Sequence, residues 1–275
     1  MKNVENISLQ PNKKIYFVSD FHLGAPNLEE SRSRERRIIR WLDEISKDAQ
    51  AVFLLGDIFD FWFEYKHVVP KGHVRMLGKL AEMADNGIDL RLFVGNHDLW
   101  TFGYLEKEIG IKIYRKPQLI KINETLCFLG HGDGLGPYHR NYKHLKKLFT
   151  CRYNQHLLAF LHPWIGVGLA SFFSQRSRVR AEKKMSRFIY KEGETLDVFC
   201  KEYLQKNPDV SYFIFGHRHL PLEVKISEKS TYFNTGDWVD HNSYLELKME
   251  NGKPHVRIEN FNSVEGFVVQ SLQPK

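Results

Sequence analysis

Short apolar runs recur along the chain, and each one is followed by a glycine or an aspartate. The runs cover residues 14–19, 52–55, 90–94, 125–129 and 212–215. Runs of this length, rich in Val, Ile, Leu and Phe and bounded by glycine, are typical of buried β-strands. We therefore expect five strands, each of which delivers an Asp, Asn or His side chain at its carboxyl end.

Two longer segments show helical spacing instead. Residues 29–47 place Ile38, Trp41, Leu42 and Ile45 on one face, which predicts an amphipathic helix. A second helix is expected over residues 72–86, with Gly87 at its C-terminal end. The arginines of the first helix are interpreted as a solvated face. Together with the strands, these helices predict an α/β protein, whose sites lie at the carboxyl ends of the strands.

The C-terminal part of the chain has a different pattern. Residues 222–226, 230–234, 244–249 and 255–258 have the composition of short strands, joined by turns such as residues 250–252. We expect these strands to form a β-meander packed beside the first sheet.

One interval between predicted strand ends is too long for a single strand and helix. The chain from His131 to His217 contains a surplus, residues 135–191, that is aromatic and apolar in its middle and basic at its flanks. Its apolar part is interrupted by His162, Pro163 and two glycines, so it is too short for a membrane-spanning helix of about 20 residues. Two interpretations remain open: short helices packed on the body, or a cap whose apolar face meets lipid chains.

Composition limits the possible partners. The 275 residues carry a net charge of +7, which favours phosphate groups, nucleic acid or an anionic membrane surface. The three cysteines form no CxxC pair and fit a reducing compartment. The first 14 residues contain no apolar segment, so no signal peptide is expected.

The polar residues at the strand ends have the chemistry of a metal site. Oxygen and imidazole donors without cysteine suit Mn, Fe, Co or Zn. Two such ions about 3.5–4 Å apart can clamp the attacking and leaving oxygens of a displacement at phosphorus. Asp57, after the most apolar strand, is the expected bridge between them. The candidate ligands are Asp20, His22, Asp57, Asn96, His131, His217 and His219.

Five motifs carry a resemblance to the calcineurin-like metallophosphoesterases. They are Asp20-Phe-His22, Gly56-Asp57-Ile-Phe-Asp60, Gly95-Asn96-His97-Asp98, Gly130-His131 and Gly216-His217-Arg-His219. The resemblance implies two mixed β-sheets flanked by helices, an α+β sandwich with a dinuclear site at the loop ends. It also implies that water activated by the metal ions attacks phosphorus.

The same resemblance implies a role for each residue. Asp20, His22, Asp57 and His219 would hold one ion, and Asp57, Asn96, His131 and His217 the other. His97 would protonate the leaving group or stabilise charge on the phosphoryl oxygens. Asp98 would hydrogen-bond His97 and orient it, and Asp60 would support the ligands without being one.

The segments GDIFDFWFE and HGDGLG, together with the insertion, resemble a narrower branch, the UDP-2,3-diacylglucosamine pyrophosphohydrolases of lipid A synthesis. This resemblance implies a Mn-dependent enzyme that releases UMP and 2,3-diacylglucosamine 1-phosphate at the cytoplasmic face of the inner membrane. It implies a core of residues 1–134 and 192–275 and a helical lid of residues 135–191. The best-studied enzymes of the branch have Arg in place of His97. The expected substrate contacts are Asn96, His97, Tyr142, Ser177, Arg178 and Lys184.

Two other functions remain possible from the sequence. Another phosphoesterase of the same fold, acting on nucleotides or phosphodiesters, is compatible with the basic charge. A nuclease should bind with a steep salt dependence, and no nucleic-acid partner is expected here. A non-catalytic scaffold on the same fold would be expected to have lost ligands, and this chain retains the full set.

Overall fold

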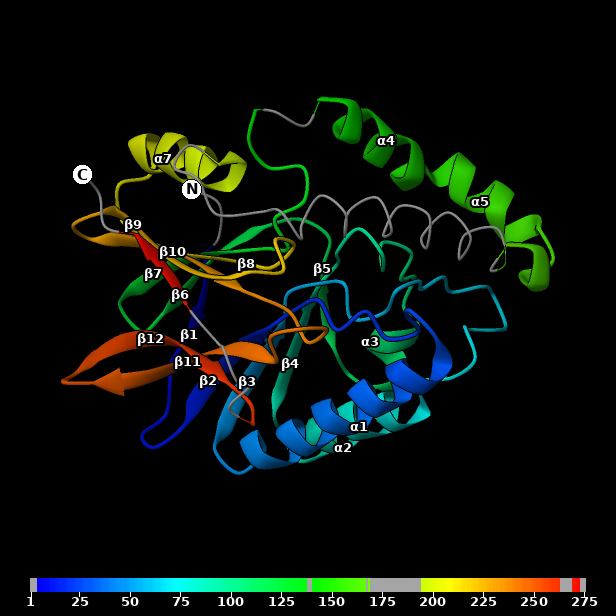
Figure 1. Cartoon of the computed structure of the whole chain (residues 1–275), viewed down its shortest axis with the longest axis horizontal. Helices are drawn as coiled ribbons and strands as arrows, with labels where there is room; N and C mark the ends of the chain where they lie inside the picture. The colour runs from blue at the N-terminus through cyan, green and yellow to red at the C-terminus, as the bar shows by residue number, and fades with distance from the viewer. Residues whose placement is uncertain (1–3, 138–139, 167, 169–193, 263–268, 273–275) are drawn as a thin grey trace.

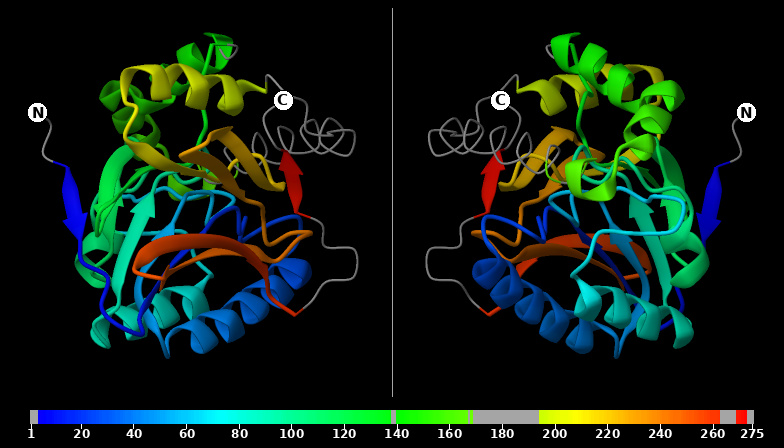
Figure 2. Two further views of the ribbon diagram at one scale, coloured as in Figure 1. Left: turned by 90° about the vertical axis from the view of Figure 1, so that its left-hand side faces the viewer. Right: turned by 90° about the vertical axis from the view of Figure 1, so that its right-hand side faces the viewer.

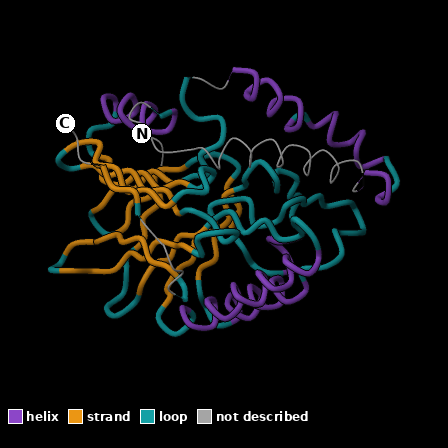
Figure 3. Tube along the Cα trace, viewed as in Figure 1, coloured by secondary structure: helices purple, strands orange, loops and turns teal. Residues whose placement is uncertain are grey.

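The computed structural model describes residues 4–137, 140–166, 168, 194–262 and 269–272 (Figure 1). Two β-sheets are stacked face to face, and helices cover their outer faces, as Figure 3 shows. One apolar cluster lies between the sheets and contains Phe17, Phe53 and Phe233. The other two clusters lie between each sheet and its helices. The expected α/β sandwich of two mixed sheets is confirmed.

The six-stranded sheet carries the first half of the chain. Its order is β12 (Lys253–Asn260), β11 (Ser243–Glu250), β2 (Lys14–Val18), β3 (Ala49–Leu54), β4 (Asp89–Phe93) and β5 (Lys112–Tyr114). Strands β2 to β5 run parallel, whereas β11 is antiparallel to both β2 and β12. Along β2, Ile15 and Phe17 face the other sheet, and Tyr16 and Val18 face the helices. This alternation is the period of two expected of a strand buried on both sides.

The seven-stranded sheet has the order β1 (Glu5–Ile7), β6 (Gln118–Ile122), β7 (Thr125–Leu129), β8 (Val210–Phe215), β10 (Ser230–Thr235), β9 (Pro221–Ser227) and β13 (Gln270–Leu272). Strands β7, β8 and β10 are parallel neighbours at its centre. The strands predicted over residues 14–19, 52–55, 90–94, 125–129 and 212–215 are therefore β2, β3, β4, β7 and β8. They divide between the two sheets.

Helices α1 (Leu28–Ile45) and α2 (Val74–Asp85) cover the six-stranded sheet, and α7 (Thr195–Lys206) covers the other (Figure 2). Helix α1 begins after Asn27, whose side chain accepts a hydrogen bond from the backbone N–H of Glu30. Its apolar face buries Ile38, Trp41 and Leu42, as the spacing predicts. A short helix, α3 (Tyr104–Glu108), lies between β4 and β5.

The four predicted C-terminal strands are present, but the prediction that they form a single β-meander is wrong. Strands β9 and β10 belong to the seven-stranded sheet, whereas β11 and β12 extend the six-stranded one. Residues 236–242 cross from one sheet to the other. Trp238, in this crossover, is fully buried against Phe21 and Trp41, and this packing fixes the crossover beside the loop after β2.

The insertion is described in part. Helices α4 (Arg140–Thr150) and α5 (Arg152–Phe160) follow one another along one side of the core, and we call them together the arm (Figure 1). No residue of α5 is buried. Among the described helices, none combines the length and the apolar character needed to cross a bilayer. The expected contacts Ser177, Arg178 and Lys184 lie outside the described residues.

Candidate metal centre

The carboxyl ends of five strands bring the candidate ligands together. Asp20 and His22 follow β2, Asp57 follows β3, Asn96 follows β4, His131 follows β7, and His217 and His219 follow β8. The ligand atoms of Asp20, His22 and His219 form one group, and those of Asp57, His131 and His217 form a second. Within each group all ligand atoms lie within 4.8 Å of one another. Residues far apart in the sequence, and from both sheets, therefore meet at one place.

The backbone at this place adopts conformations that are uncommon for residues with side chains. Asp20, His22, Asp57, His217 and His219 all have positive φ angles, between +44° and +70°. Such angles are sparsely populated outside glycine, and they gather at functional sites where the surrounding fold enforces them. Five of the seven candidate ligands are held in this way.

Gly95 and Gly216 of the motifs lie so close to neighbouring loops that no side chain fits at either position. A Cβ on Gly95 would lie 2.1 Å from Oδ1 of Asp57, and a Cβ on Gly216 would lie 2.2 Å from Oγ of Ser19. Any side chain at these positions would push the loops apart. The glycines therefore let the loops of different strands approach closely enough for their polar side chains to meet.

In the first group, nitrogen and oxygen atoms converge on one point. Nε2 of His219 lies 3.1 Å from Oδ1 of Asp20 and 3.2 Å from Nε2 of His22. The other ring nitrogen of His219, Nδ1, lies 3.2 Å from Oδ2 of Asp237. A carboxylate can only accept there, so Nδ1 carries the proton in the neutral ring. Nε2 then presents a lone pair towards Asp20, in the tautomer that a metal ligand needs.

The second group repeats this arrangement. Nδ1 of His131 lies 2.7 Å from the carbonyl oxygen of Leu55, which fixes the proton of the neutral ring on Nδ1. Nε2 of His131 then faces Oδ2 of Asp57 at 3.3 Å and Oδ1 of Asn96 at 3.2 Å. Asp57 also lies near the first group, with Oδ2 3.9 Å from Nε2 of His22. Its carboxylate therefore occupies the position of a bridge between the two groups.

The ring nitrogens of His219 and His131 point their lone pairs at the carboxylate oxygens of Asp20 and Asp57. This arrangement is favourable only with a positive charge between the two atoms, and a metal ion would supply that charge. Without an ion, a proton takes that place: burial opposes it, but the adjacent Asp57 raises the pKa of His131 to about 10. Burial and the neighbouring His131 lower the pKa of His217 to about 3, so this ring is neutral. The donors are imidazole nitrogens, carboxylates and an amide, the set preferred by divalent ions of the Mn to Zn series.

His97 lies beside the first group but is oriented differently from expectation. Its Nδ1 lies 2.9 Å from the carbonyl oxygen of Asp60 and 3.5 Å from Oδ1 of the same residue. Oδ1 of Asp60 also lies 3.4 Å from Nδ1 of His22. Asp60 therefore orients two histidines, and the role expected of Asp98 falls to it.

Asp98 instead organises the loops. Its two carboxylate oxygens accept hydrogen bonds from the backbone N–H groups of Gly95 and Ile58, at 2.6 and 2.9 Å. These bonds join the loop after β4 to the loop after β3. Burial, and then the charge of Asp57, raise the pKa of Asp98 to about 7.

Two acidic residues at the site were missed from the sequence. Asp237 holds His219, and Asp133 lies two residues after His131, where it accepts hydrogen bonds from the hydroxyl of Tyr142 and from Nζ of Lys146. Tyr142, expected as a substrate contact, is therefore engaged with the loop after β7. Gly236-Asp237 follows β10 in the way that Gly56-Asp57 follows β3, and this repeated pattern was the available signal.

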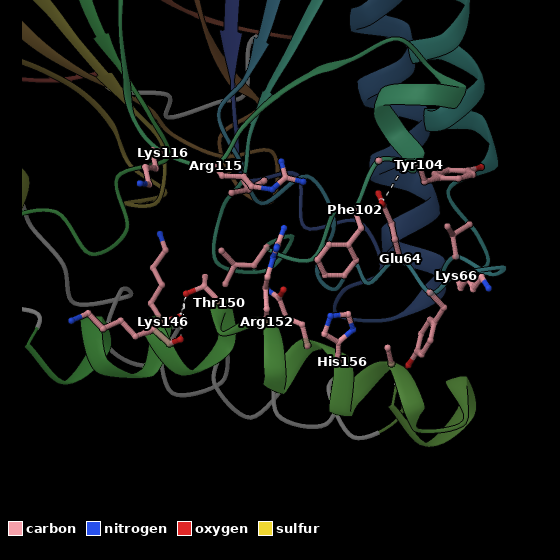
Figure 4. A pocket seen from close by; sticks show the side chains of 18 of the residues that line it. Glu64, Lys66, Phe102, Tyr104, Arg115, Lys116, Lys146, Thr150, Arg152 and His156 are labelled. Atoms are coloured by element: carbon pink, nitrogen blue, oxygen red, sulfur yellow. Dashed lines mark hydrogen bonds between the residues drawn. The ribbon is translucent and has the colours of Figure 1, made fainter. Parts of the chain in front are cut away.

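A pocket of about 1700 Å³ lies between the arm and the loops of the core. Its lining includes Val94 and Asp133, each two residues from a candidate ligand, but none of the candidate ligands themselves. Figure 4 shows Lys146, Arg152 and His156 on the arm side and Phe102 and Glu64 on the core side. Apolar residues of the core, including Val68, Val69, Val94 and Leu99, form part of the wall, and Lys and Arg residues from both sides form another part. The pocket can take a molecule that is apolar over one part and anionic over another.

Comparisons with known proteins give matches over most of the chain. A family model described as calcineurin-like phosphoesterase matches residues 13–221. A UDP-2,3-diacylglucosamine hydrolase of Porphyromonas gingivalis is 37% identical over 248 residues, which cover 84% of this chain and 92% of that protein. A protein of the same name from Ectopseudomonas mendocina is 28% identical over 229 residues, or 82% and 90% of the two chains. A solved dimetal phosphatase from Danio rerio covers 90% of this chain and 96% of its own at 15% identity, with a TM-score of 0.44. The matched range of the family model contains every candidate ligand.

Proposed function

The chain belongs to the calcineurin-like phosphoesterase family, and on this premise we propose that it hydrolyses the pyrophosphate of UDP-2,3-diacylglucosamine. The products would be UMP and 2,3-diacylglucosamine 1-phosphate, as in lipid A synthesis. The observation that carries this choice is the pocket of about 1700 Å³, part apolar and part basic, whose lining includes residues of two loops that carry candidate ligands. The relative at 37% identity that bears this activity in its name supports the same choice.

Two divalent ions, which we propose to be Mn, would be held by the two groups of ligands. Asp20, His22, Asp57 and His219 would hold one, and Asp57, Asn96, His131 and His217 the other. When bound, such ions supply an activated water and neutralise charge on the phosphoryl oxygens. The supporting feature is that Asp237 and the Leu55 carbonyl already fix two of the rings in the ligating tautomer.

His97 would act on the substrate itself. Burial lowers the pKa of His97, so the ring is neutral at pH 7 before substrate binds. A pyrophosphate brings negative charge and raises that pKa, since the charged imidazole is then favoured. The ring, held at Nδ1 by Asp60, would take up a proton and deliver it to the leaving group. Asp98 would contribute by fixing the two loops between which the substrate lies.

The remaining assignments rest on the arm. We propose that residues 135–191 form a lid over a core of residues 1–134 and 192–275, and that acyl chains lie in the pocket. Asn96, His97, Ser177, Arg178 and Lys184 would contact the polar part of the substrate. The arm exposes large apolar side chains and carries basic ones, a combination suited to the anionic cytoplasmic face of the inner membrane.

The test is direct. The purified protein is incubated with Mn and UDP-2,3-diacylglucosamine in mild detergent, and UMP is measured by mass spectrometry beside the variants Asp57→Ala and His97→Ala. UMP from the wild type and little from either variant is the expected result. Hydrolysis of a soluble phosphodiester without UMP release would keep the family and reject the lipid substrate. Full activity in either variant would reject the assigned chemistry.

A further inference from the structure

Helix α4 is attached to the core through a carboxylate of a ligand-bearing loop. Asp133 is buried two residues after His131. Its Oδ2 accepts hydrogen bonds from Oη of Tyr142 and from Nζ of Lys146, each at 2.6 Å. Lys143, on the same part of the helix, donates to the carbonyl oxygen of Gly136 at 2.7 Å. The N-terminal half of α4 is thus bound to the loop that follows β7.

The C-terminal end of α4 is attached to a second ligand-bearing loop. Nε1 of Trp100 donates a hydrogen bond of 2.9 Å to the carbonyl oxygen of Phe149. The two rings also meet edge to face, with centroids 5.7 Å apart. Trp100 follows His97 by three residues, in the loop after β4. Each end of the helix therefore depends on a different loop of the metal centre.

Core packing does not hold this helix. Among residues 142–150, whose side chains the structure describes, none is buried, and Leu148 and Phe149 are exposed. A helix without a buried face is positioned by its polar contacts, because it buries too little apolar surface to fix its place. The bonds to Asp133 and Trp100 are accordingly the contacts that set how far α4 lies from the core.

We propose that Asp133 and Trp100 are positioning residues that hold α4 over the pocket and so set the affinity for a lipid-bearing substrate, without touching the reacting phosphate. The proposal rests on the proposed function for its substrate. A substrate with acyl chains needs both walls of the pocket, whereas a small phosphodiester needs only the loops of the metal centre. Loosening α4 should therefore weaken the first reaction and spare the second.

The experiment uses the full chain loaded with Mn and two variants that cut the attachments one at a time. Tyr142→Phe removes the hydroxyl that donates to Asp133, and Trp100→Phe removes the donor to Phe149; both variants keep an aromatic ring. Tyr212→Phe is the matched control, because it removes a hydroxyl whose hydrogen bond, to the carbonyl oxygen of Pro254 at 3.2 Å, lies outside the pocket. UDP-2,3-diacylglucosamine and bis(p-nitrophenyl) phosphate are the two substrates.

We expect KM for the lipid substrate to rise about tenfold in Tyr142→Phe and Trp100→Phe, the effect of losing one hydrogen bond of this kind. The kcat for that substrate, the kcat/KM for bis(p-nitrophenyl) phosphate and the metal content should stay within about twofold of the wild type. Amide hydrogen exchange over residues 142–150 should become faster in both variants and remain unchanged in Tyr212→Phe. Since Asp133→Asn acts through the same contact, the rise in KM in the double variant with Tyr142→Phe should be smaller than the two single effects combined.

Exchange at the wild-type rate in both variants would overturn the proposal, because α4 would then be held by something else. A parallel loss with both substrates, together with loss of metal, would also overturn it, since the residues would then act on the metal centre. If the wild type releases no UMP from the lipid substrate, the proposed function fails, and hydrogen exchange still decides whether the two residues hold α4.

Discussion

At the metal centre the histidine rings are fixed by buried partners, whereas no side chain of α5 is buried at all. The ligands come from loops anchored in two sheets, and their rings are held by Leu55, Asp60 and Asp237. The arm instead exposes large apolar residues, with Tyr153 69% and Phe160 88% exposed. Chemistry at phosphorus demands fixed geometry, while a surface that receives an amphiphile does not. On the proposed function, the rigid part of the molecule would perform the reaction and the exposed part would select the substrate.

The largest expected effect is a loss of activity when the metal centre itself is changed. Asp57→Asn removes the negative charge between the two ligand groups. Because the ions supply several kcal/mol of transition-state stabilisation, activity on lipid and soluble substrates alike should fall about 10³-fold. Metal content, measured by elemental analysis, should fall as well. Asp209→Asn, at an exposed position, is the control, and equal activity of both variants would contradict the bridging role.

A smaller loss of metal affinity is expected when Asp237, which contacts the candidate ligand His219, is replaced. Asp237→Asn weakens the contact that fixes the tautomer of His219, and such outer contacts typically contribute 10–100-fold to metal affinity. Affinity for Mn should therefore fall by about that factor, with activity restored at high Mn concentration. Asp240→Asn removes a charge from the same crossover and should change the affinity little. Failure of excess Mn to restore activity would indicate a different role for Asp237.

The stability of the fold should depend on pH through the side chain of His73. His73 packs against the ring of Phe59, and burial lowers its pKa to about 4, below the value near 6.5 of an unfolded chain. The neutral ring therefore stabilises the fold above pH 6.5, and this contribution is lost as the pH falls from 6.5 towards 4. Between pH 7.5 and pH 5 the free energy of unfolding should drop by about 2 kcal/mol from this group. His73→Asn, which tolerates the positive φ at this position, should show a correspondingly smaller drop in urea titrations.

The smallest effect is expected from exposed apolar residues at the end of the arm and just beyond it. Replacing Phe160, the last residue of α5, and Trp164 together by Ser removes apolar surface that is already exposed, so folding should be unaffected. If acyl chains or membrane lipid cover these rings, KM for the lipid substrate should rise about fivefold, corresponding to roughly 1 kcal/mol of lost burial. Activity on bis(p-nitrophenyl) phosphate should not change. A fall in the latter reaction would show that the arm and the metal centre are not separable.

The sequence could predict which side chains gather at the strand ends because their signal is local. A strand that ends in Gly-Asp or Gly-His places its polar side chain at a known edge of a sheet, so Asp20, Asp57 and His131 could be assigned from short motifs. Partners that depend on the meeting of distant loops could not be assigned. The family resemblance implied that Asp98 orients His97, whereas in the fold Asp60, from another loop, lies against the ring.

The C-terminal strands show the same limit at a larger scale. Their alternation and turns predicted four strands correctly but not the sheet that each one joins. That choice depends on the crossover at residues 236–242 and on the burial of Trp238, which is a tertiary interaction. For the arm, apolar and basic positions could be counted from the sequence. Which of them faces the pocket depends on the contacts of Asp133 and Trp100.

The division of the ligands between the sheets links metal binding to folding. Asp20, Asp57 and Asn96 extend from the six-stranded sheet, whereas His131, His217 and His219 extend from the seven-stranded one. If these two sets of residues hold ions together, metal binding would stabilise the contact between the sheets, because its free energy would add to that of folding. Chelation would then lower the melting temperature as well as the activity, and the thermal transition would report how fully the centre is loaded.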